Sequence, residues 1–264
     1  MVGAWLLLFS SGAFAQTTPG APPQKIANAQ EFARNGRKLY YNLRSEGLVR
    51  YQCNLYPDWD LFFSKLNLPG TEADARREQF KKIKFQFTLG SANEVQLTHS
   101  DIDVASEVEQ RRMYQFYSGM DKMVHGFFQT WSEFMLHNFL DAAGSNDVVL
   151  DDGDTYRIEG DTNGSHAVLI FGKDYVMREM RAITPEFSGT VRPTFSPSAK
   201  GLILTSFSAA YKPSTATESK LNATISYTPV NGLQLPKQVL FDVETGEKKI
   251  AVSFSFDNCT AEKH

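Results

Sequence analysis

One long apolar helix candidate, Ala105–Ala142, and the series of amphipathic strand candidates that follows it, from about Val148 to Cys259, constrain the fold most. Strands that alternate apolar and polar residues build an antiparallel sheet with one apolar face, which another element has to cover. A helix rich in aromatic and methionine side chains can cover it. The sequence therefore predicts an α+β fold, in which a curved antiparallel sheet forms an open half-barrel meander and helices cover its concave face.

The strand candidates alternate with a period of two residues, and short turns separate them. The turn sequences include Asp152-Gly153, Asn163-Gly164, Gly172-Lys173-Asp174, Asn231-Gly232 and Thr245-Gly246-Glu247. Asn-Gly is a strong hairpin signal because both residues tolerate positive φ, and short turns make neighbouring strands antiparallel. We expect about seven strands after Gly144 and three before it. Pro193, Pro197 and Pro213 fit sheet edges or the beginnings of loops better than strand centres.

Before the long helix candidate, helix and strand candidates alternate along the chain. In order, they are a helix over Asn28–Glu46, a strand over Leu48–Tyr56, a short helix over Asp58–Leu66, a charged helix or solvated connector over Glu72–Lys82, and a hairpin that joins residues 85–89 to residues 95–97.

Apolar residues recur at three- and four-residue steps along the long helix candidate, as expected for one face of a helix. These residues are Met113, Phe116, Tyr117, Met120, Val124, Phe127, Trp131, Phe134, Met135 and Phe139. A helix of about 37 residues would be about 55 Å long, which exceeds the width of a domain of this size. We therefore expect a kink at Gly119 or Gly126, or two helices that meet there.

The N-terminus has the pattern of an export signal. Ala4–Phe14 is an apolar stretch without charge, and Ala13-Phe14-Ala15 has small residues at the two positions that signal peptidase reads. The basic residues that usually precede such a stretch are missing, so the segment is either a cleavable signal peptide or an N-terminal anchor. We interpret residues 1–15 as a signal peptide, residues 16–27 as a flexible leader and residues 28–264 as a single domain. The predicted location is the periplasm or the extracellular space.

The two cysteines, Cys53 and Cys259, fit an exported protein, in which a pair of cysteines usually forms a disulfide. The bond would join the first long strand candidate to the last and bring the two ends of the domain together. In the chain-entropy model, closing a loop of about 200 residues stabilises a fold by up to about 5 kcal/mol. Two buried free thiols are the alternative.

The C-terminal stretch carries a resemblance to a known family. Gly232-Leu233-Gln234-Leu235-Pro236-Lys237, then Val239–Val243, a turn and Ile250–Phe256, looks like the closing hairpin of the periplasmic lipoprotein- and lipid-carrier superfamily with the LolA/LolB-like fold. The order of signal peptide, N-terminal helix, interleaved helices and sequential strands is also similar. The long aromatic helix and the paired cysteines depart from that pattern. The resemblance implies a hydrophobic cavity that is covered by helices and can take an acyl chain.

The sheet-facing side of the long helix is the main candidate site. Methionine and aromatic side chains make an adaptable apolar wall of the kind that lines ligand cavities. The cavity candidates are Met113, Phe116, Met120, Phe127, Trp131 and Phe134. The alternative is that these side chains pack on the sheet as ordinary core, and the two roles are compatible.

No pattern in the chain indicates a cofactor, a metal or a catalytic residue. The acidic run Asp151-Asp152-Gly153-Asp154 lacks the EF-hand spacing and lies where a turn is expected. His99, His125, His137, His166 and His264 form no H-x-x-x-H or H-E-x-x-H pair. The motifs G-x-S-x-G, the P-loop and G-x-G-x-x-G are absent.

These patterns together predict a non-catalytic exported protein that binds a lipid, an acyl chain or another hydrophobic small molecule between the sheet and the helix. The net charge of −3 gives no basic field for nucleic acid, and no stretch is long and apolar enough to predict a stable membrane span. The alternatives are an envelope scaffold or protein-interaction domain with a fully packed core, and a hydrolase without a recognisable motif.

Overall fold

The computed structural model describes residues 24–25, 29–64, 70–101, 106–137, 140, 148–162, 165–215 and 217–264. The predicted signal peptide and nearly all of the predicted leader lie outside these residues. So do Phe139 and the Asn163-Gly164 turn.

The described strands form one sheet, and all of its pairings are antiparallel. The helices are α1 (Ala29–Arg37), α2 (Trp59–Ser64), α3 (Gly70–Phe80) and α4 (Glu107–Met135). The strands are β1 (Gln24–Lys25), β2 (Leu48–Pro57), β3 (Phe85–Gly90), β4 (Val95–His99), β5 (Val148–Asp151), β6 (Thr155–Thr162), β7 (Ser165–Gly172), β8 (Met177–Ile183), β9 (Phe187–Ser198), β10 (Gly201–Pro213), β11 (Ser219–Val230), β12 (Leu233–Thr245) and β13 (Lys248–Lys263). Within the described residues, the thirteen strands follow the order β1-β5-β6-β7-β8-β9-β10-β11-β12-β13-β2-β3-β4.

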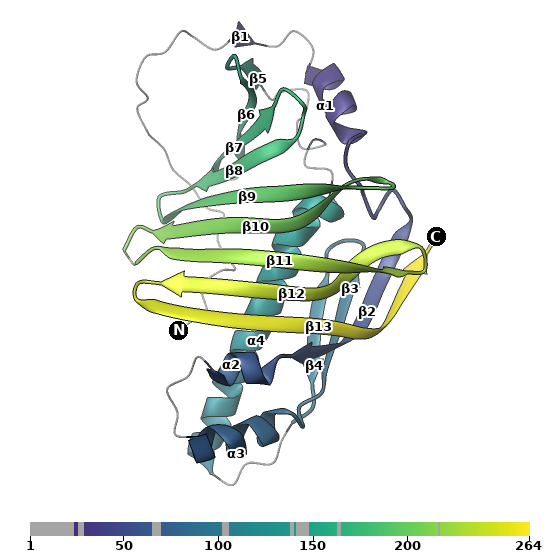
Figure 1. Ribbon diagram of the computed structural model, residues 1–264. Helices are drawn as coiled ribbons and strands as arrows, with labels where there is room; N and C mark the ends of the chain where they lie inside the picture. Colours follow the sequence, from purple (N-terminus) through teal and green to yellow (C-terminus); the bar gives the residue numbers. More distant parts are fainter. Residues whose placement is uncertain are drawn as a thin grey trace.

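Helices α1 and α4 pack against the same face of this sheet, which we call the inner face (Figure 1). Phe32 of α1 contacts Tyr156 and Phe171 on β6 and β7, at centroid distances of 5.1 and 5.4 Å. Phe127 of α4 contacts Phe207 on β10 and Phe241 on β12. The cross-strand register places all of these sheet residues on one face, because directly opposed residues point the same way. The opposite side is the outer face.

Two strands that lie far apart in the sequence are neighbours in the sheet, as the cysteines predict. β13 pairs with β2, and a disulfide joins Cys53 to Cys259 across 206 positions of sequence. The prediction of this bond is confirmed. The contact with β13 extends past the end of β2, because the amide of Asp58, just before α2, donates to the Ser253 carbonyl of β13 over 2.8 Å.

Short turns with positive φ connect the C-terminal strands. Asn231 and Gly232 have φ of 49° and 74°, and Gly246 has φ of 59°. These are the conformations that asparagine and glycine adopt at the least steric cost, and they allow the two-residue hairpins that the sequence predicts.

Both long helix predictions extend too far. α1 ends at Arg37 and not at Glu46, because the backbone of the following residues bonds elsewhere: Leu202 pairs with Leu39 and Tyr41, and the Leu43 amide donates to the Met135 carbonyl over 2.8 Å. α4 covers Glu107–Met135 within the predicted 105–142.

The ends of α4 have local causes. It begins after the N-cap residue Ser106, whose hydroxyl accepts from the Glu109 amide and donates to the Glu109 carboxylate. It continues as one helix of 29 residues through Gly119 and Gly126, so the expected meeting of two helices there is wrong.

The proline prediction is confirmed: Pro193 and Pro197 lie in the part of the twelve-residue strand β9 that pairs with β10 alone among the described strands, which makes it a sheet edge, and Pro213 ends β10. The two prolines of β9 are tolerated there because the pairing of β9 with β8 covers only Ser188–Val191. Pro193 and Pro197 have no amide hydrogen to donate, but β8 does not pair with this part of β9, so no hydrogen bond between the two strands is lost.

Candidate functional site

The structure places the six predicted cavity residues in the interior. Met113, Met120, Phe127, Trp131 and Phe134 are buried, and Phe116 is half-buried. Neighbouring Phe128 stacks on Phe87 of β3 at a centroid distance of 4.0 Å and meets Phe256 of β13 edge-on. Five of the six residues therefore belong to the buried core and Phe116 packs against it, while the role of the six in binding a ligand stays a prediction.

Polar bonds fix the C-terminal half of α4 to the sheet. Trp131 Nε1 donates to the Tyr227 hydroxyl over 2.9 Å, and that hydroxyl donates to the Leu204 carbonyl. Leu204 lies where the register between β9 and β10 shifts, so the buried hydroxyl satisfies a carbonyl at the irregularity. Burial raises the pKa of Tyr227 far above its usual range, and the hydrogen bond from Trp131 opposes that rise only in part.

Two further tyrosine hydroxyls, of the buried Tyr51 and the half-buried Tyr40, also bond to the backbone. Tyr51 donates to the Pro236 carbonyl over 2.8 Å, next to a register shift between β11 and β12. Tyr40 donates to the Tyr175 carbonyl and accepts from the Met177 amide. Burial raises the pKa of both phenols. These hydroxyls are therefore structural groups that remain protonated.

The N-terminal half of α4 lies in different surroundings. Phe116 meets rings from α2 and α3, at centroid distances of 5.7 Å to Trp59 and 4.6 Å to Phe80. With Phe62 and Phe63, these side chains form what we call the aromatic cluster, where α2, α3 and the first part of α4 come together (Figure 1). Phe62, Phe80 and Phe116 are only half-buried, so solvent reaches the rim of the cluster.

The titratable candidates have local structural partners. In the Asp151–Asp154 turn, Asp151 bonds to Lys173 and to the Gly153 amide, which lowers the pKa of its carboxyl. Asp152 pairs with Arg157 at 2.9 Å. His99 stacks on Tyr117, and His125 contacts the Val95 carbonyl through Nε2 at 2.9 Å. Across the described part of the chain, no three His, Cys, Asp or Glu side chains are grouped so that they could hold a metal ion.

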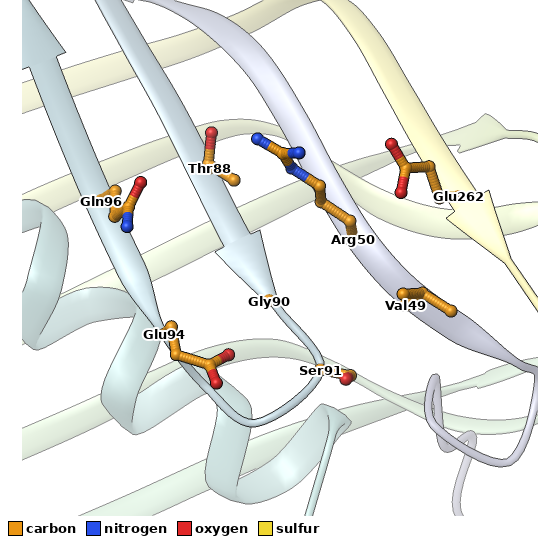
Figure 2. A pocket seen from close by; sticks show the side chains of 8 residues that line it. All are labelled: Val49, Arg50, Thr88, Gly90, Ser91, Glu94, Gln96 and Glu262. Atoms are coloured by element: carbon orange, nitrogen blue, oxygen red, sulfur yellow. The ribbon is translucent and has the colours of Figure 1, made fainter.

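The outer face has a hollow of about 370 Å³ that the sequence patterns did not predict (Figure 2). We call it the outer hollow. It is lined by Val49, Arg50, Thr88, Gly90, Ser91, Glu94, Gln96 and Glu262. The hollow exists because Gly90 has no side chain next to Arg50, its partner on β2. A Cβ at this position would overlap the carboxylate of Glu94, which lies over the glycine.

Comparison of the chain with protein-family models, with curated proteins and with solved structures found no match. Within the described residues, no helix has both the length and the apolar composition to cross a membrane. The resemblance to lipid carriers therefore remains a prediction, as does the export signal.

Proposed function

We propose that this is a non-catalytic exported protein that binds an acyl chain or similar hydrophobic ligand on the inner side of the sheet, at the aromatic cluster and along α4. The sheet would curve around α4 as an open half-barrel, with helices covering its concave face. The disulfide and the absence of a membrane-crossing helix from the described residues are compatible with an exported protein. The proposal keeps the resemblance to the lipid-carrier superfamily as its family hypothesis.

The observation that carries the proposal is the half-buried aromatic cluster at the end of a continuous apolar helix face. The rings of Phe62, Phe80 and Phe116 are reached by solvent, and the buried side chains of Met113 and Met120 lie on the same helix. Unbranched methionine side chains change rotamer easily and adapt to an inserted chain. A ligand can thus enter at the rim and displace ring–ring contacts.

The driving force would be the transfer of apolar surface from water. It amounts to about 25 cal/mol per Å², or about 0.8 kcal/mol for each CH₂ group. An acyl chain of about a dozen carbons can therefore be held by burial of its apolar surface, without polar contacts to the protein. The polar bonds at Trp131 would keep the far half of α4 in place while the cluster opens.

The first experiment is organic extraction and mass spectrometry of the protein purified from an exporting host, beside a mock purification. We expect a lipid in stoichiometric amount. The second is quenching of tryptophan fluorescence by doxyl-labelled stearic acid. In a Trp5→Phe background, Trp131→Phe leaves Trp59 as the reporter and Trp59→Phe leaves Trp131.

Saturable quenching of Trp59 is the expected result, and quenching of Trp131 as well would extend the ligand along α4. Phe116→Ser should abolish the saturable quenching of Trp59, because Phe116 is part of the aromatic cluster. Tyr114→Ser is the matched control, since Tyr114 lies two residues away on the same helix with 76% of its surface exposed. If Phe116→Ser does not melt cooperatively, Phe62→Ser at the rim takes its place. Unsaturable or absent quenching of both tryptophans, from protein without co-purified lipid, contradicts the proposal.

A second candidate function is an envelope scaffold or protein-interaction domain with a permanently packed core. The stack of Phe128 on Phe87 and the complete burial of Trp131 favour it. It predicts no co-purifying lipid and no saturable quenching.

A further inference from the structure

We propose that the outer hollow binds a neutral oligosaccharide, which extends from the hollow along the outer face of β2 to Tyr56. This inference is independent of the proposed lipid site, because it concerns the opposite face of the sheet.

The polar side chains of the outer hollow are free to bind a ligand. In the described part of the chain, the side chains of Arg50, Glu94 and Glu262 form no ion pair, and those of Thr88, Ser91 and Gln96 form no hydrogen bond. In Figure 2 these side chains surround the bare backbone at Gly90. Converging donors and acceptors around a concave floor are typical of a small-molecule site.

One other part of the outer face differs from the outer hollow. On β6, β8 and β9 the charged side chains neutralise one another: Arg157 pairs with Glu159, and Arg181 and Arg192 both pair with Glu179. The charges of these residues on β6, β8 and β9 are therefore already paired. The charged side chains around the outer hollow have no such ion pairs among the described residues.

A path for a longer ligand leads away from the outer hollow. Gln52, Asn54 and Tyr56 follow Arg50 at every second position of β2, so their side chains point to the outer face. Six residues of strand span about 20 Å. Tyr56 is 50% exposed and gives a ring on which a sugar ring can stack. Gln86 and Gln96 lie beside this path on β3 and β4.

The charges select a neutral polyhydroxyl ligand. Two carboxylates, Glu94 and Glu262, oppose an anion, and Arg50 opposes a simple cation. Sugar hydroxyls both donate and accept, so they can bond to carboxylates, guanidinium, amides and hydroxyls together. A hydrophobic ligand would leave these groups unbonded, which is costly.

The test is titration of the ¹⁵N-labelled full chain with cellohexaose, maltohexaose, xylohexaose and chitohexaose, followed by NMR. We expect at least one of them to give saturable shifts confined to residues 49–56, 86–96 and the amides near Glu262. Glu94→Ala and Arg50→Ala should each weaken binding by about tenfold or more, because each removes a charge-assisted hydrogen bond. Tyr56→Ala should weaken it by a few-fold.

Asp242→Ala is the matched control, because this exposed carboxylate lies on the outer face of β12 and away from the path. It should leave the affinity unchanged. Gly90→Ala fills the floor of the outer hollow and should also reduce binding while the far strands keep their spectrum. The proposal is overturned if none of the four sugars shifts these resonances, if the shifts map elsewhere, or if the Glu94 and Arg50 variants bind normally. Shifts produced equally by sodium phosphate would overturn the sugar assignment.

Discussion

The two halves of α4 meet the rest of the protein in different ways. From His125 to its C-cap Leu136, hydrogen bonds hold the helix. Trp131 bonds to Tyr227, His125 bonds to the Val95 carbonyl, and the side-chain amide of Asn42 donates to the Leu136 carbonyl. Around Phe116 the helix meets the rings of α2 and α3 at a half-exposed rim. Directed bonds fix one arrangement, whereas ring contacts can be exchanged for others of similar energy. One helix can therefore be a fixed support at one end and an adaptable surface at the other.

The largest test of this comparison replaces one tryptophan in each half. Trp131→Ala removes a fully buried ring and its bond to Tyr227, and we expect a loss of about 3–5 kcal/mol in the free energy of unfolding. Trp59→Ala should cost less, since the half-exposed rings of Phe62 and Phe80 can close over the space. Urea unfolding measures both. Equal losses would remove the distinction between the two halves.

Tyr227→Phe tests the polar bonds alone. The ring stays, but the Trp131 indole and the Leu204 carbonyl lose their partner, so we expect a loss of about 1–3 kcal/mol. Tyr114→Phe on the exposed side of α4 is the control and should change stability by less than about 0.5 kcal/mol. If both variants unfold at the wild-type urea concentration, the hydroxyl relay does not hold α4.

The buried tyrosines also predict a dependence on alkaline pH. Burial raises the pKa values of Tyr40, Tyr51 and Tyr227, so above the unfolded value of about 10 the folded state holds protons that the unfolded state has released. Their stabilisation is complete below about pH 10 and is lost above it, by up to about 1.4 kcal/mol per pH unit for each tyrosine. Urea unfolding from pH 9 to 12 should show this decline. Its slope should be smaller in Tyr227→Phe, and an identical slope would contradict the assignment.

His125→Ala should have the smallest effect of the four. The residue ties the middle of α4 to the free edge of β4 through the Val95 carbonyl, and it is part-buried, so we expect a loss of about 1 kcal/mol. Hydrogen exchange at Gln96 and Thr98 gives the local measurement, because the register with β3 turns these two amides of the edge strand toward β3. Protection that is unchanged in the variant would show that the edge is held by something else.

The parts of the fold that could be predicted from sequence are those with a local signal. Asn231-Gly232 and Thr245-Gly246-Glu247 mark real hairpins, and Phe85, Phe87 and Leu89 alternate as a half-buried strand should. The pair Cys53–Cys259 supplied the one long-range constraint, and it is confirmed.

The parts that failed depend on tertiary bonds. No local pattern reveals that Leu202 and Met135 take the backbone bonds of residues 39–43 and so end α1 early. Alternation on β10 breaks at the register shift near Leu204, where the compensating hydroxyl comes from Tyr227 on the next strand. The outer hollow needs Gly90 beside Arg50, which the pairing of β2 with β3 sets, and Arg50 beside Glu262, which is set only when β13 pairs with β2. A glycine at the end of a strand candidate was the one available sign.

The position of β2, β3 and β4 beyond β13 has a consequence in time. These strands emerge early during synthesis, yet β2 pairs with β13, which is the last of the described strands in the sequence. Pairing across so long a sequence separation is slow to form. Cys53 therefore waits as a thiol for almost the whole of synthesis, and since the chain has only two cysteines, no third one offers a wrong internal partner. The order of the strands makes oxidation a late event, which seals the sheet after its last strand has arrived.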